Sequence, residues 1–284
     1  MMLNMSGRIR LITDSGADVP LYYREKYGIE VVPLTVLFGR AEFKDQVDLS
    51  VEEFWEKLAQ AEELPATNQV NPHEFAEVFE PYLKQGDTIL YIGLSSKLSG
   101  TLQSAQLAKE LLKSAKIHIF DSKSASLGVA LYVIKAAEMI AAQASVPEIL
   151  AALEQKQRDS AAYFILDSLT HLVKGGRLTR TQGLVGTILN IKPVLKITKA
   201  GTIEIDEKVR STKRALQTIV DKAQATGIDF SQKKLAVAYT YGAAPAAELK
   251  EMVIERLQPL EVIEGLIGPT IGTHAGPGGL GLLF

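Results

Sequence analysis

The chain has 284 residues, a formal net charge of −2 at pH 7 and 23% charged residues. A charge balance so close to neutral gives no reason to expect nucleic acid as a partner. The chain contains no cysteine, which excludes disulfide bonds, a thiol nucleophile and cysteine-ligated metals. The length allows one large domain or two ordinary domains with a sizeable core.

No apolar run approaches the roughly 18 residues that predict a membrane-spanning helix. The first ten residues include Asn4, Ser6 and Gly7, so they lack the apolar centre of a signal peptide. We therefore expect a cytoplasmic protein without stable membrane insertion. A lipid ligand of such a protein would be carried and not embedded.

Strand and helix patterns alternate along the first half of the chain. Short apolar runs bounded by turn residues predict strands at 9–13, 30–36, 88–92 and 117–120. Apolar residues at helical spacing predict helices at 21–26, 51–60, 72–85, 102–114, 124–142 and 146–157. This alternation is typical of an α/β domain with a mainly parallel, Rossmann-like sheet.

A second half begins near Ser160 with a predicted strand at 161–166. It continues with a hairpin of strands at 193–197 and 202–209, a helix at 212–225, a strand at 234–240, a helix at 244–257 and a strand at 262–267. We therefore expect two α/β domains, residues 8–159 and 160–284, that pack closely with a ligand between them.

The segment from Leu94 to Thr101, with the sequence LSSKLSGT, places four hydroxyl side chains within seven residues between a predicted strand and a predicted helix. The first N–H groups of a helix lack intrahelical partners and lie at the positive end of the helix dipole. Such a position binds an anionic group without a lysine or an arginine. The alternative is an ordinary helix start, with Ser96 or Ser99 as the N-cap.

Polar residues also follow other predicted strands. The segments DSGAD (14–18) and FDS (120–122) stand at strand ends, and parallel strands present such loops at one edge of a sheet, where ligands bind. Thr67 lies in a further polar loop. His274 stands in a glycine-rich closing segment in which no helix is predicted, and glycines allow the backbone to approach a ligand closely. For His274 a ligand contact is favoured over a turn-stabilising role.

The closing segment, residues 272–284, has two interpretations. Its glycines favour a mobile lid over the ligand, and an acid beneath this lid would keep His274 protonated. In the alternative, the segment packs its apolar end, Leu280 to Phe284, into the core. His118 alternates with buried-type isoleucines and is expected to be structural, and His73 and His171 are expected at the surface or in local packing. Metal clusters are therefore not expected.

Eight motifs, in their order along the chain, resemble those of the DegV family. They are DSGAD (14–18), PATNQ (65–69), LSSKLSGT (94–101), FDS (120–122), VKGGRLT (173–179), KPVL (192–195), KVRSTKRA (208–215) and GTHAGPGGLGLLF (272–284). Many members have TSQ where this chain has Thr67-Asn68-Gln69, but the threonine is kept. The resemblance implies a bacterial protein that binds a long-chain fatty acid, such as palmitate, for phospholipid metabolism.

The resemblance further implies a non-catalytic carrier that presents the acyl carboxylate to a separate kinase for phosphorylation, with no cofactor and no metal. The residues expected to hold the carboxylate are Thr67, Ser96, Ser99, Gly100 and His274. Arg177 lies in a glycine-flanked basic segment, which is either a solvated loop or a docking site for the kinase. The alternative function is a serine-dependent hydrolase or acyl transferase that uses Ser99 and His274. However, Ser99 does not lie in a G-x-S-x-G motif, the nucleophile turn of many such enzymes.

Overall fold

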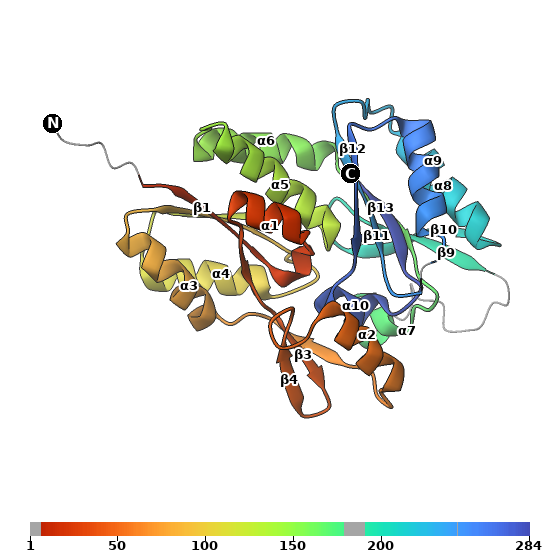
Figure 1. Ribbon diagram of the computed structural model, residues 1–284, viewed down its shortest axis with the longest axis horizontal. Helices are drawn as coiled ribbons and strands as arrows, with labels where there is room; N and C mark the ends of the chain where they lie inside the picture. Colours follow the sequence, from red (N-terminus) through yellow and green to blue (C-terminus); the bar gives the residue numbers. More distant parts are fainter. Residues whose placement is uncertain (1–6, 179–190, 243) are drawn as a thin grey trace.

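The computed structural model describes residues 7–178, 191–242 and 244–284 (Figure 1). A four-stranded sheet has the order β2-β1-β6-β7, and all of its neighbouring strands are parallel. Its strands are β1 (Ile9–Asp14), β2 (Glu30–Val32), β6 (Thr88–Gly93) and β7 (Ile117–Asp121). The prediction of an α/β protein with a parallel first sheet is confirmed.

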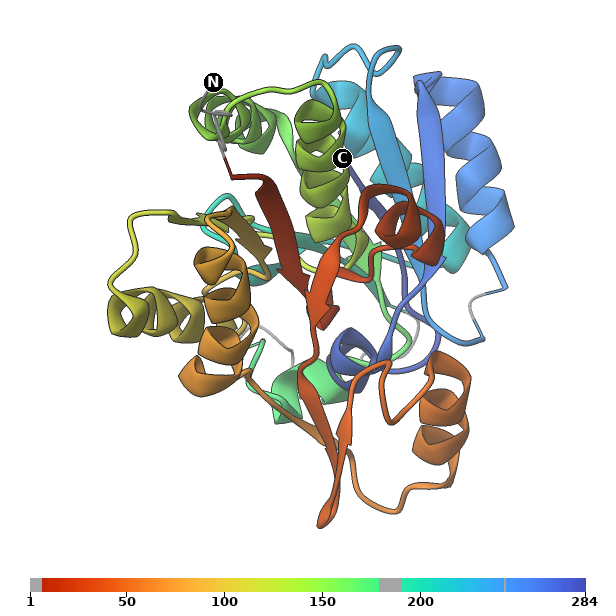
Figure 2. The same cartoon turned by 60° about the vertical axis from the view of Figure 1, so that its left-hand side comes forward.

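Helices cover both faces of this sheet because side chains alternate along each strand. Ile89 and Tyr91 point to the face covered by α3 and α4, whereas Leu90 and Ile92 belong to the apolar cluster under α5. Figure 2 shows the two layers. The helices of this half are α1 (Leu21–Tyr27), α2 (Val51–Gln60), α3 (Pro72–Lys84), α4 (Thr101–Leu112), α5 (Leu127–Ala141) and α6 (Val146–Asp159), and the 3₁₀ helix η1 (Ser15–Ala17) follows β1.

The single strand predicted at 30–36 is wrong. The chain leaves the parallel sheet at Pro33, which has no N–H to continue the ladder. Leu34 donates its N–H to the Ser15 hydroxyl at 3.0 Å, and the next residues enter a separate antiparallel sheet of order β4-β3-β5. Its strands are β3 (Thr35–Phe38), β4 (Ala41–Lys44) and β5 (Ala66–Asn68). This small sheet fixes the position of Thr67, which pairs with Val36.

The six-stranded sheet of the second half has the order β10-β9-β8-β13-β11-β12. Only the β11–β12 pair is parallel. The predicted hairpin is present as β9 and β10, and α8 and α9 pack on one face of the sheet (Figure 1). The elements are β8 (Ala162–Ile165), α7 (Thr170–Lys174), β9 (Lys192–Ile197), β10 (Ile203–Val209), α8 (Thr212–Ala225), β11 (Lys234–Tyr239), α9 (Ala246–Leu257), β12 (Glu261–Leu266), α10 (Pro269–Ala275) and β13 (Leu280–Leu283).

The closing segment is not a mobile lid. Residues 269–275 form helix α10, and β13 is inserted between β8 and β11 in the interior of the second sheet. Leu280, Leu282 and Leu283 are buried, as the alternative interpretation predicted. The glycines between helix and strand provide a turn: Gly276 and Gly278 have positive φ angles, which glycine adopts without strain.

The predicted division at residue 159 falls between α6 and β8. An apolar cluster crosses this boundary, with members from the first sheet such as Leu11 and Leu90 and from the second such as Ala162, Ala236 and Leu283. The two halves therefore share buried surface. Their status as two domains stays a prediction.

A candidate ligand site between the two large sheets

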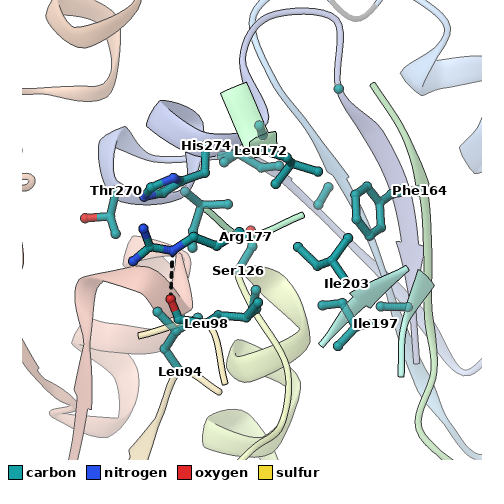
Figure 3. A pocket seen from close by; sticks show the side chains of 18 of the residues that line it. Leu94, Leu98, Ser126, Phe164, Leu172, Arg177, Ile197, Ile203, Thr270 and His274 are labelled. Carbon is teal, nitrogen blue, oxygen red and sulfur yellow. Dashed lines mark hydrogen bonds between the residues drawn. The ribbon is translucent and has the colours of Figure 1, made fainter. Parts of the chain in front are cut away.

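A largely apolar cavity of about 860 Å³, its open mouth included, lies where the carboxyl ends of the parallel strands face the six-stranded sheet (Figure 3). The loop after β6 contributes Leu94, Leu98 and Ser99, and α10 contributes Ile271 and His274. The second sheet supplies apolar wall residues, namely Ala162, Phe164, Ile197, Ile203, Ala238, Leu280 and Leu283.

The cavity has a polar end and an apolar end. Figure 3 shows His274 and Arg177 on one side and Phe164, Ile197 and Ile203 on the other. Two of the lining hydroxyls are engaged elsewhere, because Ser126 donates to Asp18 at 2.6 Å and Thr270 lies 3.5 Å from the Ser15 hydroxyl. The remaining polar lining groups are Thr67, Ser99, Arg177 and His274.

Thr67 and His274 form a pair although they are 207 positions apart in the chain. Thr67 Oγ1 lies 2.8 Å from His274 Nε2. When the imidazole donates through Nε2, the Thr67 hydroxyl proton is left free for a ligand oxygen. Strand β5 positions the threonine and helix α10 positions the histidine, so the small antiparallel sheet and the closing segment jointly form this end of the cavity.

His274 is neutral in the unliganded protein. Burial and, to a smaller extent, the charges of Arg177 and His171 together lower the pKa of its imidazole to about 4. The expected protonation of His274 beside a bound acid stays a prediction. Its Nδ1 atom is buried and, among the described residues, has no hydrogen-bond partner. His274 Nε2 faces the Thr67 hydroxyl, whereas the Ser99 hydroxyl lies beside that of Thr101.

Ser99 lines the cavity immediately before helix α4. Its hydroxyl accepts the N–H of Thr101 at 3.2 Å and lies 2.9 Å from the Thr101 hydroxyl. The N-cap residue of α4 is Gly100, so the prediction that Ser96 or Ser99 occupies the N-cap position is wrong. Ser99 thus keeps a hydroxyl at the cavity wall.

Two of the predicted site residues lie outside the cavity lining. Ser96 is exposed and donates its hydroxyl to Asp121 at 2.6 Å. Gly100 faces Gln69, and a Cβ atom at this position would lie 1.9 Å from Gln69 Oε1. The structure therefore brings Thr67, Ser99 and His274 together at one cavity.

Arg177 is not on an exposed loop. It is half-buried, lines the cavity and donates from Nε to the Leu98 carbonyl at 2.9 Å (Figure 3). Burial lowers the pKa of its guanidinium. The last residue of the VKGGRLT motif, Thr179, lies outside the described residues.

The sequence pattern did not indicate the role of Gly175. A Cβ atom here would lie 2.3 Å from His274 Nδ1 and 2.9 Å from the His171 carbonyl oxygen. Neither the imidazole ring nor the backbone can yield at low cost, so only glycine leaves room for His274 in its present position. The signal in the sequence is the Gly175-Gly176 pair, which we interpreted as a loop.

In the part of the chain that the structure describes, no helix combines the length and the apolar composition needed to cross a membrane. Within the same residues, no group of three or more histidines and carboxylates is arranged to hold a metal ion.

A family model described as "Uncharacterised protein, DegV family" matches residues 8–284. The chain belongs to the DegV family. A DegV domain-containing protein of Caldanaerobacter subterraneus is 38% identical over 277 residues, which cover 98% of each chain. The structure of a DegV family protein from Thermus thermophilus, described as binding fatty acid, has a TM-score of 0.88 and 33% identity, covering 97% of this chain and 98% of the other.

A second solved structure is also similar to this chain. It is the fatty acid kinase B3 protein of Streptococcus pneumoniae loaded with linoleic acid, with a TM-score of 0.85 and 26% identity, covering 98% of this chain and 99% of the other. The family assignment made from the eight motifs is thus confirmed.

Proposed function

We propose that this DegV protein is a non-catalytic carrier of a long-chain fatty acid, which presents the acyl carboxylate to a separate kinase in the cytoplasm. The observation that supports this most strongly is the cavity itself, with its apolar interior and the Thr67–His274 pair beside Ser99 at one end. Fatty acid in related structures, one of them a fatty acid kinase B3 protein, supports the same ligand and partner.

The apolar part of the cavity supplies most of the binding free energy. Burying about a dozen methylenes at ~0.8 kcal/mol each gives a gross gain of ~10 kcal/mol. Fixing a flexible chain and losing translational freedom subtract several kcal/mol, which leaves roughly micromolar to nanomolar affinity. Strong attraction at the head group is therefore unnecessary.

The head-group end supplies hydrogen bonds and little fixed charge. Ser99 and Thr67 can donate to an acid or to a carboxylate, and a bound carboxylate raises the pKa of His274 toward its ordinary value. The hydroxyl groups also remain suitable partners when the carboxylate becomes an acyl phosphate. Arg177 stands half-exposed at this same end, where a kinase must approach, so we retain it as part of the proposed docking surface.

The carrier function is tested by reconstitution with a fatty acid kinase. The loaded protein, the kinase catalytic protein and ATP should together form acyl phosphate, whereas the carrier alone should not hydrolyse ester substrates.

The Arg177→Ala variant should retain most of the lipid but form acyl phosphate more slowly, and raised salt should slow acyl-phosphate formation by the wild type. Arg210→Ala, in the exposed KVRSTKRA segment, is the matched control and should behave as wild type. If the Arg177→Ala variant loses its lipid, Arg177 belongs to the binding pocket and not to a docking surface for the kinase.

Gly175→Ala tests the position of His274 without changing any polar side chain. The added methyl group would overlap the imidazole, so His274 should lose its place beside Thr67, and fatty-acid affinity should fall at least tenfold. Titration with a fluorescent fatty acid measures this.

Gly176→Asn is the control for this substitution. Gly176 has a φ angle of 76°, which asparagine adopts more readily than most other residues. A Cβ atom added at this position would meet no other atom within 4 Å. Wild-type affinity of Gly175→Ala would show that the position of His274 does not matter for binding.

A further inference from the structure

A second cleft lies apart from the fatty-acid cavity and shares no lining residue with it. It is bounded by the C-terminal halves of α5 and α6, by the residues at the start of β11, and by Phe284. Its space is about 1,210 Å³, the open mouth included. Figure 1 shows the α5–α6 pair beside the chain end that is marked C.

The cleft carries an excess of positive charge. Its charged lining residues are Lys135, Glu138, Lys156, Asp159, Lys233 and Lys234. Both carboxylates are already paired, because Lys233 contacts Asp159 at 2.7 Å and Lys234 contacts Glu138 at 3.0 Å. Lys135 and Lys156 have no carboxylate partner among the residues that the structure describes. Two ammonium groups therefore line the cleft without an ion pair of their own, although the charge of Asp159 also acts on Lys156.

These ammonium groups lie close enough to repel each other. Burial, together with the positive charges of Lys233 and Lys135, lowers the pKa of Lys156 to about 8, whereas the charge of Asp159 acts in the opposite direction. The Lys156 ammonium lies 5.4 Å from the centre of the Tyr132 ring, which offers only a weak substitute for an anion. An arrangement of like charges at a partly buried position is unfavourable in the free protein, and an anion would relieve it.

A polar group beneath Lys156 is also without a partner. The Tyr132 hydroxyl is buried and makes no hydrogen bond to any described residue. It lines a smaller cavity that adjoins the cleft through Ser160 and Phe284. This hydroxyl faces the smaller cavity, which Ser160 also lines, and it does not line the cleft that holds the lysines.

We propose that this cleft binds the phosphate group of a small molecule, with Lys156 and Lys135 as its principal ligands. Lysine ammonium groups are compact charges with three donors, which suits a phosphate, and two unpaired lysines suit its double negative charge. Leu131, Ile134 and Phe284 add apolar wall, so the ligand would be a phosphate carried on a partly apolar body. This site is independent of the fatty-acid cavity.

Calorimetric titration of the full chain with pyrophosphate, at constant ionic strength, tests this proposal. Wild-type protein should bind in a saturable manner with one site and a Kd below about 1 mM. Lys156→Met should weaken binding at least tenfold, and Lys135→Met, a more exposed variant less prone to misfold, should weaken it severalfold. Both variants should keep the lipid occupancy of the wild type. A loss of pyrophosphate binding can therefore be distinguished from a failure of the carrier function.

Lys57→Met is the matched control, because Lys57 also lies over an aromatic ring, 5.3 Å from that of Phe43, but outside the cleft. It should bind pyrophosphate as wild type does. Absence of saturable binding, or equal losses in Lys57→Met and Lys156→Met, would overturn the proposal.

Discussion

The double variant Thr67→Val, Ser99→Ala is expected to bind fatty acid about a hundredfold more weakly than the wild type. Each lost hydrogen bond to a charged head group costs about 1.5–3 kcal/mol, and 1.4 kcal/mol corresponds to a tenfold change in affinity. Both substitutions are small and lie at the cavity wall, so thermal melting should barely change. Displacement of a fluorescent lipid measures the affinity.

The control for this pair is Ser96→Ala in the same LSSKLSGT segment. Ser96 bonds to Asp121 and lies outside the cavity, so its removal should leave fatty-acid affinity intact. Equal affinity of the double variant and the wild type would remove Thr67 and Ser99 from the head-group site.

Asp18→Asn is expected to stabilise the protein at alkaline pH. Asp18 follows β1 and is partly buried; it accepts the Gly268 N–H at 3.0 Å and the Ser126 hydroxyl at 2.6 Å. Burial, assisted by the charge of Asp45 and opposed by the hydrogen bond from Ser126, raises its pKa from 3.8 to about 7. An asparagine carbonyl can still accept from Gly268, and its amide can donate to Ser126.

The direction in which stability changes with pH follows from how tightly each state binds the Asp18 proton. The folded state binds the Asp18 proton more tightly than the unfolded state, so this stabilising contribution is full below pH 3.8 and is lost as pH rises through about 7. A difference of about 3 pKa units corresponds to a loss on the order of 4 kcal/mol in the free energy of unfolding once the group is ionised. Asp18→Asn avoids this loss, so its melting temperature should exceed that of wild type at pH 8.5, and the gap should shrink toward pH 5.

Asp229→Asn is the control for the pH effect. Asp229 is exposed, and the Ser231 N–H lowers its pKa, so its neutralisation should give no gain at pH 8.5. A constant difference between Asp18→Asn and wild type across this pH range would show that Asp18 does not titrate with a raised pKa.

The parallel sheet and the β9–β10 hairpin could be predicted because their apolar patterns are local. The small antiparallel sheet could not, because the apolar run continues on both sides of Pro33. The proline marks a break, but the new direction of the chain depends on the Ser15 contact with Leu34. The closing segment was misjudged for a similar reason. Its glycines suggest mobility, but β13 acquires its order from β8 and β11, which lie far away in the sequence.

The candidate site shows the same limit. Thr67, Ser99 and His274 stand in polar or glycine-rich segments, so each could be singled out from the sequence alone. The roles of Gly175 and Gln69 could not, because they depend on a close approach to His274 and to Gly100 across the fold. Arg177 looked exposed because its neighbours are glycines and basic residues, but its contact with Leu98 turns it to the cavity.

The most direct test of the carrier function is to extract the purified protein with organic solvent and to identify the released molecules by mass spectrometry. The proposed function predicts about one long-chain fatty acid per chain, or stoichiometric uptake when the emptied protein is offered one. A protein that releases no fatty acid and takes up none would contradict it.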